Sequence, residues 1–272
     1  MERIQRPVEL ARLQRVADFA SSMAVPANVP GDTEVPAAVP SERHPATRVA
    51  IDLAKLRENR GVLPEDRGPA AQAYRMLRTQ ILQQVRHHGV RALGVVSAVD
   101  GEGKSVTALN LALGIAAESN QNVLLVDLDL RRPSLARLLG LEVGEGLEAW
   151  FAGVTSIGDL CRGIEGIDRL EVVPTLAPVP NSSAMLAARR SQEMIRDLKG
   201  AQRDGLVIFD LPPVLLTDDV LTISHLLDGM VLVASEGITK RDDVARTREL
   251  LGNVRLLGTV LNRASESEKR AY

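Results

Sequence analysis

The stretch that most constrains the fold is Ser97–Ser105, which reads Ser-Ala-Val-Asp-Gly-Glu-Gly-Lys-Ser. An apolar run over 92–96 precedes it, and a helix-compatible stretch over 106–117 follows. A glycine-bearing loop between a strand and a helix is typical of phosphate binding, because glycines let backbone N–H groups approach phosphate oxygens closely. The helix that follows adds its positive N-terminal end. The sequence therefore predicts a phosphate-binding loop here.

Two side chains of this loop carry the expected chemistry. Lys104 is placed to reach the β- and γ-phosphates, and Ser105 to offer its hydroxyl to Mg²⁺. The alternative, a tight surface turn that fits a short pattern by chance, is disfavoured by the strand and helix on either side. The residues that we expect to bind the nucleotide are Asp100, Gly101, Glu102, Gly103, Lys104, Ser105 and Val106.

Two further apolar runs end in carboxylates, 123–126 before Asp127 and 206–209 before Asp210. Continuous apolar runs suit strands of a parallel sheet covered on both faces, and such sheets bind ligands beyond the carboxyl ends of their strands. Two carboxylates crowded beside phosphates repel each other unless a cation joins them. We therefore expect a magnesium site formed by Ser105, Asp127 and Asp210. The alternative is that each aspartate caps a helix.

Strand and helix patterns alternate along the rest of the chain. This alternation predicts an α/β fold, a doubly wound and mostly parallel sheet of the P-loop NTPase type with flanking helices. Expected strands cover 92–96, 122–127, 170–173, 206–210, 230–234 and 256–261. Expected helices cover 69–87, 134–139, 146–152, 155–162, 183–198, 218–227 and 240–251. Trp150 and Phe151 are expected in the core.

Composition excludes several classes of protein. The formal net charge is −2 and aromatic residues make up 2%, which argues against binding of nucleic acid. The single cysteine, Cys161, excludes an intrachain disulfide and suits a reducing compartment. No apolar run approaches the 18 residues of a membrane-spanning helix, and the N-terminus lacks an apolar signal core. We expect a cytoplasmic protein.

Residues 50–265 resemble the bacterial tyrosine autokinases of capsular and exopolysaccharide loci. The resemblance rests on Gly101–Ser105, Asp127–Pro133, Pro180–Ser182, Phe209–Pro213 and Val260–Arg263. Asp-x-Asp-x-Arg after the second core strand is the most specific of these elements. Ile51–Leu53 and Leu63–Glu65 are similar to the subgroup found beside exosortase systems.

The resemblance implies that Lys104, Ser105, Asp127 and Asp210 hold ATP with Mg²⁺, that Asp129 lies near the accepting tyrosine, and that Asn262 lies near the base. Independently, Asp127 and Asp129 point the same way in an extended loop, so one can serve the metal while the other accepts a hydroxyl proton. Arg131 can neutralise phosphate charge or form a salt bridge to a neighbouring carboxylate. The expected catalytic residues are Lys104, Asp129 and Arg131.

The apolar spacing at 1–19 predicts an amphipathic helix, with a frayed solvated helix as the alternative, and the prolines at 20–48 predict a Pro/Ala-rich linker. A P-loop ATPase or kinase domain is expected at 49–265 and a tail at 266–272. The resemblance also suggests partners. A separate membrane chain-length (co-polymerase) protein would activate the enzyme and hold it at the inner membrane. The face of helix 69–87 that carries Gln72, Arg75 and Arg78 is available for another subunit, as in a homo-oligomer, or is an ordinary basic face exposed to solvent. Gln72 stands where the family has Glu, which weakens such contacts.

The leading functional hypothesis is an ATP-dependent protein-tyrosine kinase-like ATPase that regulates exopolysaccharide biosynthesis or export. The chain lacks a tyrosine cluster and has only Tyr74, expected to pack as a ring, and Tyr272 as a possible acceptor. One alternative is therefore a regulatory ATPase of polysaccharide assembly without significant kinase activity. A positioning ATPase of the partitioning or septum-site type ranks lower, because those proteins carry a lysine where this chain has Val99.

Overall fold

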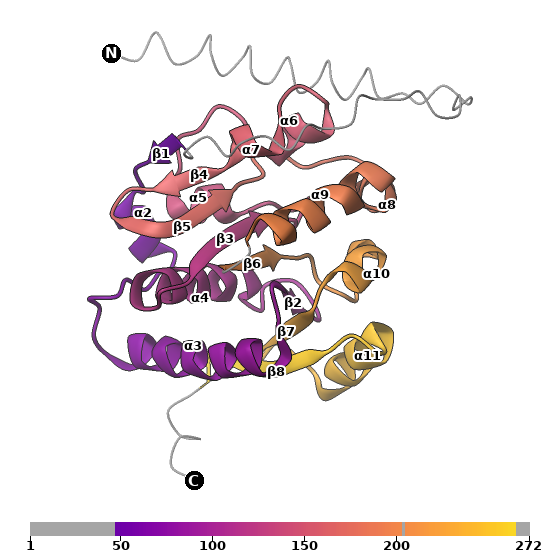
Figure 1. The fold of residues 1–272 in the computed structure, drawn as a ribbon. Coiled ribbons are helices and arrows are strands. Elements are labelled where there is room, and N and C mark those ends of the chain that lie inside the picture. Colours follow the sequence, from indigo (N-terminus) through magenta and orange to yellow (C-terminus); the bar gives the residue numbers. More distant parts are fainter. Residues whose placement is uncertain (1–46, 203–204, 265–272) are drawn as a thin grey trace, which may run out of the picture. The chain divides into compact units, whose positions relative to one another are not determined.

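The computed structural model describes residues 47–202 and 205–264 (Figure 1). The helix expected at 1–19, the linker up to residue 46 and the C-terminal tail with Tyr272 lie outside the described residues. Thr47 and Arg48, which we assigned to the linker, instead form a strand with Val49. These two residues therefore belong to the sheet.

One sheet of eight strands organises the described chain. Its strands are β1 (Thr47–Val49), β2 (Ala92–Ser97), β3 (Asn122–Asp127), β4 (Arg162–Ile164), β5 (Ile167–Val173), β6 (Gly205–Asp210), β7 (Gly229–Ser235) and β8 (Leu256–Asn262). Their order is β1-β4-β5-β3-β6-β2-β7-β8. All neighbouring pairs are parallel except β4 and β5. The predicted mostly parallel α/β sheet is confirmed.

Helices cover both faces of the sheet (Figure 1). One face carries α2 (Leu53–Glu58), α3 (Pro69–His88), α4 (Lys104–Glu118) and α5 (Leu135–Leu139). The other carries α6 (Leu147–Phe151), α7 (Ile157–Leu160), α8 (Ser182–Ala187), α9 (Arg189–Ala201), α10 (Asp219–Ile223), the 3₁₀ turn Ser224–Leu226 and α11 (Arg241–Leu251). Successive strand side chains alternate between these two cores, which is why the strands read as continuous apolar runs.

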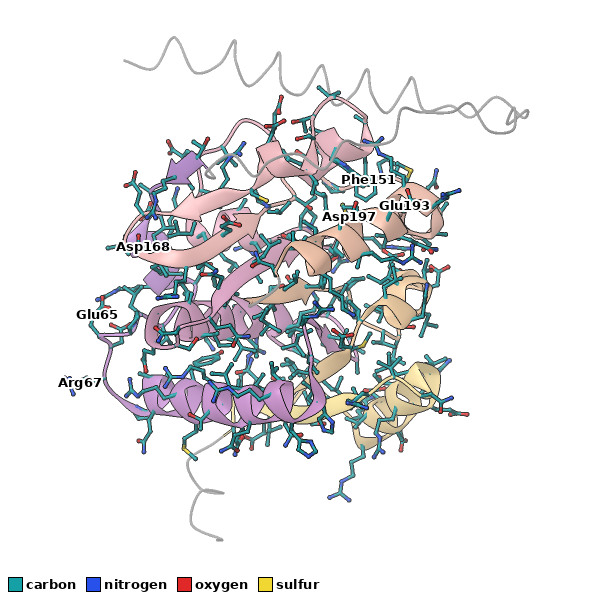
Figure 2. All side chains as sticks on the ribbon, in the orientation of Figure 1. Glu65, Arg67, Phe151, Asp168, Glu193 and Asp197 are labelled. Atoms are coloured by element: carbon teal, nitrogen blue, oxygen red, sulfur yellow. The ribbon has the colours of Figure 1, made fainter. Side chains whose placement is uncertain are left out.

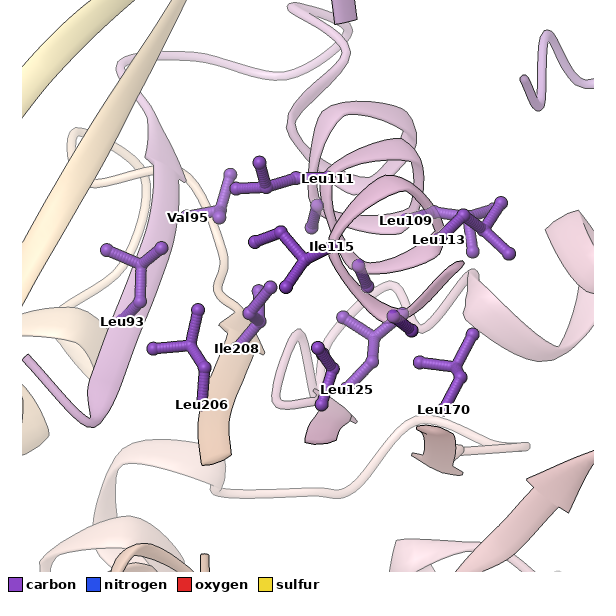
Figure 3. Close-up of a cluster of buried hydrophobic side chains, with 14 of the residues drawn as sticks. Leu93, Val95, Leu109, Leu111, Leu113, Ile115, Leu125, Leu170, Leu206 and Ile208 are labelled. Atoms are coloured by element: carbon purple, nitrogen blue, oxygen red, sulfur yellow. The ribbon is translucent and has the colours of Figure 1, made fainter. Parts of the chain in front are cut away.

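Helix α4 is the most deeply buried helix of the first layer. Leu109, Leu111, Leu113 and Ile115 are at most 1% exposed. Figure 3 shows them beside strand residues such as Ile208. Because this helix is apolar around most of its circumference, packing on the sheet and on neighbouring helices fixes its position. Its N-terminus is thereby held at the carboxyl edge of the sheet.

The predicted single helix over 183–198 is wrong, since the structure has α8 and α9 there. The two helices meet at Ala188, whose ψ of 141° is extended. The buried Ser191 hydroxyl donates a hydrogen bond to the Met185 carbonyl at 2.6 Å. This bond stands in for the helical hydrogen bond that the Met185 carbonyl loses at the break. Helix α9 buries Met194. Its Glu193 and Asp197 are exposed, and Figure 2 labels both.

Three short elements escape the sequence analysis. Strands β1 and β4 have three residues each and pair with each other. Helix α2 begins at Asp52, whose carboxylate accepts hydrogen bonds from the backbone N–H groups of Ala54 and Lys55. Trp150 and Phe151 lie in the second core, as expected.

Candidate nucleotide-binding site

The glycine-bearing loop lies between β2 and α4, as the sequence predicts. Gly101 and Gly103 have positive φ values of 79° and 89°, which favour glycine. A Cβ atom at Gly103 would come within 2.1 Å of Asn262 Nδ2. Helix α4 begins at Lys104, so its N-terminal end faces the loop. This backbone has the form of an anion cradle.

Two residues of the expected nucleotide set support the loop with their side chains. The buried Glu102 carboxylate accepts a hydrogen bond from Val99 N at 2.9 Å and another from the Thr239 hydroxyl. Asn262, at the end of β8, donates from Nδ2 to the Glu102 carbonyl at 2.9 Å. The loop is therefore anchored to β8 and to the segment after β7, contacts that the sequence analysis missed.

Lys104 is the cation at the centre of the site. Its Nζ atom lies 2.6 Å from Asp129 Oδ2, 3.6 Å from Asp210 Oδ1 and 3.2 Å from Ser105 Oγ. The side chain is almost fully buried. Burial alone would lower the pKa of Lys104, but the carboxylates of Asp210 and Asp129 outweigh it and raise that pKa. The structure thus brings four of the predicted site residues together.

Asp127 and Asp210 are register partners at the ends of the adjacent strands β3 and β6. Both side chains are fully buried. Burial raises the pKa of Asp127 well above its usual value, and the neighbouring Asp210 raises it further. Burial also raises the pKa of Asp210, against the opposing effects of Lys104 and Ser105. A second cation would relieve this concentration of negative charge.

The two aspartates differ in their hydrogen bonds. Asp127 accepts from the backbone N–H groups of Ser134 and Leu135, both at 2.9 Å. Neither carboxylate oxygen of Asp210 has a hydrogen-bond partner of normal geometry among the described residues. An orphaned buried carboxylate next to the Ser105 hydroxyl offers the oxygen ligands that Mg²⁺ prefers. The residues present therefore fit a magnesium ion, with Asp210 the least committed carboxylate.

Of the two roles expected for Arg131, phosphate binding or a salt bridge, the structure shows the salt bridge. Its guanidinium donates to Asp219 Oδ1 at 3.2 Å and to Ser182 Oγ at 3.1 Å. Asp219 is fully buried and also accepts from Thr217 Oγ1 at 2.6 Å and from the Ser183 hydroxyl. These hydrogen bonds outweigh burial and lower the pKa of Asp219. Arg131 therefore joins β3 to the starts of α8 and α10.

No pattern in the sequence places Ser183, Thr217 and Asp219 in this region. Ser182 ends a motif that carried the family resemblance, which is the only signal that pointed to it. Another unexpected contact is the ion pair between Arg132 and Asp100, which connects the segment after β3 to the loop. Val106 lies in the first turn of α4, as expected.

The face of α3 that we expected to be available to another subunit is partly occupied within the chain. Gln72 is exposed, but Arg78 forms an ion pair with Glu118 of α4 and is mostly covered. Arg75 donates to the Asp66 carbonyl at 3.1 Å. Tyr74 is half-buried beside Gly114 and Glu118, towards the end of α4 that is remote from Lys104.

Comparisons with known proteins agree with this geometry. Residues 89–267 match the family model of the NUBPL iron-transfer P-loop NTPases. The tyrosine-protein kinase YwqD of Bacillus subtilis is 30% identical over 227 residues, covering 80% of this chain and 94% of the relative. CpsD, a tyrosine-protein kinase of Streptococcus agalactiae, is 30% identical over 225 residues, covering 81% and 90%. The solved kinase domain of the Escherichia coli tyrosine kinase ETK is 25% identical, with a TM-score of 0.65 and coverage of 85% and 97%.

The parallel sheet and the loop at its carboxyl edge define a P-loop NTPase. Within that class, the chain belongs to the bacterial tyrosine autokinase family. Across residues 47–202 and 205–264, no helix is both long enough and apolar enough to cross a membrane.

Proposed function

We propose that the chain is an ATP-dependent protein-tyrosine kinase-like ATPase that regulates exopolysaccharide biosynthesis or export. The observation that carries the proposal is the buried group of Lys104, Asp129 and Asp210 beside the loop. Phosphoryl transfer needs positioning and charge neutralisation more than covalent chemistry, and this group supplies both. The named tyrosine-protein kinases among the relatives support the same class of reaction.

Each side chain has a separate role in this proposal. The loop backbone and Lys104 bind the phosphates of ATP, while Ser105, Asp127 and Asp210 hold Mg²⁺. When bound, Mg²⁺ neutralises charge on the phosphates. Asp129 accepts the proton of the tyrosine hydroxyl. Its contact with Lys104 has to open first, and phosphates that attract the lysine provide the competing partner.

The proposal also covers the protein's partners and its location in the cell. A separate membrane chain-length protein activates the enzyme and keeps it peripheral at the inner membrane. Homo-oligomers form weakly, because Gln72 is neutral and the nearby arginines contact their own chain. The activator is proposed from the family resemblance and from the similarity to the named tyrosine-protein kinases.

One observation favours the second candidate, a regulatory ATPase with little kinase activity. The chain has two tyrosines. Tyr74 is half-buried on α3, at the end of α4 that is remote from the site. Tyr272 then remains as the candidate acceptor, and one tyrosine supplies a lower local concentration of acceptor than a cluster does.

The test is to incubate the full chain with Mg-ATP and the cytoplasmic part of its membrane partner, and to locate phosphotyrosine by mass spectrometry. We expect weak phosphorylation of Tyr272 that Asp129→Asn abolishes. ATP hydrolysis without phosphotyrosine on either protein would favour the regulatory ATPase. Abundant phosphate on Tyr74 would contradict the packed position of that ring.

A further inference from the structure

The two edges of the sheet differ in how they are protected. Strand β1, at one edge, has three residues, and its Arg48 forms an ion pair with Asp168 at 2.6 Å. Strand β8, at the other edge, has seven residues, Leu-Leu-Gly-Thr-Val-Leu-Asn, with no charge and no proline. Natural proteins shorten, charge or cover such edges, because unpaired backbone groups accept another strand. Strand β8 carries none of these protections within its own sequence.

The free backbone groups of β8 can be assigned from its pairing with β7. The Asn262 carbonyl accepts from Glu236 N at 3.0 Å and so points towards β7. Because successive residues of a strand point their N–H and C=O groups to alternate sides, those of Thr259 and Leu261 point away from β7. No described strand pairs with that side. The Leu261 side chain is 51% exposed.

A groove lies beside this edge, between α3 and β8. It encloses about 290 Å³ and is lined by Leu77, Gln80, Ile81, Leu257, Gly258 and Val260. A Cβ atom built at Gly258 would meet nothing within 4 Å, so the groove is open there. The rest of the lining is Gln83, Gln84 and Thr259, so the groove is uncharged and combines apolar side chains with amides. It offers apolar contacts and hydrogen-bonding groups for side chains on one face of an added strand.

The charges at the ends of β8 indicate what it can receive. Exposed Arg255 and Arg263 flank the strand, and the Arg255 end also carries His87 and His88 of α3. In an antiparallel pair of two copies centred on Thr259, Arg255 of one copy would lie opposite Arg263 of the other, which is destabilising. Acidic residues at the ends of a different segment would instead be attracted to both arginines.

We propose that β8 is a docking edge for an extended segment of another protein, uncharged over its middle and acidic at its ends. The segment pairs with the backbone of Thr259 and Leu261 and places alternate side chains in the α3–β8 groove. Strand β8 ends at Asn262, which contacts the loop through the Glu102 carbonyl. A segment bound at this edge therefore adjoins a structural support of the nucleotide site. The docking edge does not rest on the kinase reaction.

The probe for this proposal is a fluorescent nonapeptide with a Val-Thr-Val-Thr-Val centre and two Glu residues at each end. A matched peptide has Lys in place of Glu. Fluorescence anisotropy with the full chain should show the acidic peptide binding at least about tenfold more tightly, with a smaller difference at high salt. Hydrogen exchange should show new protection of the Thr259 and Leu261 amides.

Variants separate pairing from charge. Thr259→Pro removes an outward N–H from the edge and should weaken binding about tenfold or more, whereas Thr47→Pro on the opposite edge should not. Exchanging Arg255→Glu and Arg263→Glu together should reverse the preference between the peptides. This exchange tests the proposal even if Thr259→Pro does not fold.

Four results would overturn the proposal. The first is no binding of the acidic peptide, and the second is equal binding of both peptides. The third is a concentration-dependent dimer that Thr259→Pro abolishes, since β8 would then pair with a second copy. The fourth is at least tenfold tighter peptide binding by a chain that ends at residue 264, because the edge would then be covered by the chain's own tail.

Discussion

Asp210 and Asp219 are both fully buried near the carboxyl edge of the sheet, yet their surroundings are opposite. Asp210 has two oxygens without a normal hydrogen bond among the described residues, and burial raises its pKa. Asp219 accepts at Oδ1 from Arg131, Thr217 and Ser183, its Oδ2 has no partner among the described residues, and its pKa is lowered. Neither side chain is exposed, but burial dominates at the deeper Asp210, whereas at Asp219 the surrounding donors outweigh it.

The comparison separates a binding carboxylate from a structural one. A buried charge that the protein leaves unsatisfied is destabilising until a ligand or cation compensates it. A buried charge surrounded by donors stabilises the segments that supply them. Asp210 therefore fits the first description, and Asp219, which joins three segments through Arg131, fits the second.

The largest expected effect comes from removing the cation beside Asp210. Lys104→Ala should weaken ATP binding at least about 100-fold, or about 2.7 kcal/mol, because the loop loses its positive side chain. Isothermal titration with Mg-ATP measures this loss. The control is Lys199→Ala. The ion pair of Lys199 with Asp228 lies beside the first residue of β2, at the end of the strands away from the nucleotide site. Unchanged affinity in a folded Lys104→Ala protein would contradict the site.

The second prediction addresses Asp219 directly. Asp219→Asn should lower the free energy of unfolding by about 2 kcal/mol, because Arg131, Thr217 and Ser183 lose a charged acceptor. Asp210→Asn in metal-free protein should cost less, because it relieves the repulsion on Asp127 while Lys104 keeps its closer partner Asp129. Urea unfolding of the two variants measures both values. A larger loss for Asp210→Asn would reverse the assignment of the two carboxylates.

The third prediction is a pH dependence of opposite sign for the two carboxylates. The pKa values of Asp127 and Asp210 are raised from 3.8, so above pH 3.8 the folded state keeps protons that the unfolded state has released. The free energy of unfolding therefore falls as the pH rises from 3.8 towards the raised pKa values. The lowered pKa of Asp219 adds stability above pH 3.8, which is lost as pH falls further.

Unfolding curves between pH 3 and pH 8, without metal, test this dependence. Asp210→Asn should flatten the decline above pH 3.8, because it removes one titrating group and the repulsion on Asp127. Mg²⁺ should flatten the same decline in the parent protein by favouring the ionised carboxylates. An identical pH profile in parent and Asp210→Asn would show that this carboxylate does not titrate in that range.

The Asp210 side of the comparison was largely predictable from the sequence, because its signals are contiguous. An apolar strand that ends in Asp, in register with a glycine-bearing loop, places the carboxylate near the phosphates whatever the detailed packing is. The helices and strands of the core follow from the same local patterns. The orphaned oxygens of Asp210 did not follow from them, because they depend on which donors the rest of the chain fails to supply.

The Asp219 side was not predictable, because its partners are distant in sequence. Arg131 and Asp219 are 88 residues apart, and no periodic pattern connects them. The buried Glu102 carboxylate likewise accepts a hydrogen bond from Thr239, which is 137 residues away in the sequence. The three-residue strands β1 and β4 are too short to show a pattern, and their pairing with each other determines them. The break at Ala188 depends on packing and on the Ser191 hydroxyl.

The smallest expected effect tests whether the hydrogen bonds of Asp219 act one at a time. Thr217→Val keeps the shape of the side chain and removes its 2.6 Å hydrogen bond to Asp219, along with the hydroxyl that accepts from Asp219 N. Because Arg131 and Ser183 still donate to the same oxygen, the loss should be about 1 kcal/mol. The matched control is Thr222→Val, whose hydroxyl donates to the backbone carbonyl of Asp218 just before α10. In the Asp219→Asn background Thr217→Val should cost less, since the charged acceptor is absent, and a double-mutant cycle by urea unfolding measures this coupling. Fully additive losses would show that Thr217 stabilises α10 independently of the carboxylate, and that Asp219 is held by Arg131 and the α8 serines alone.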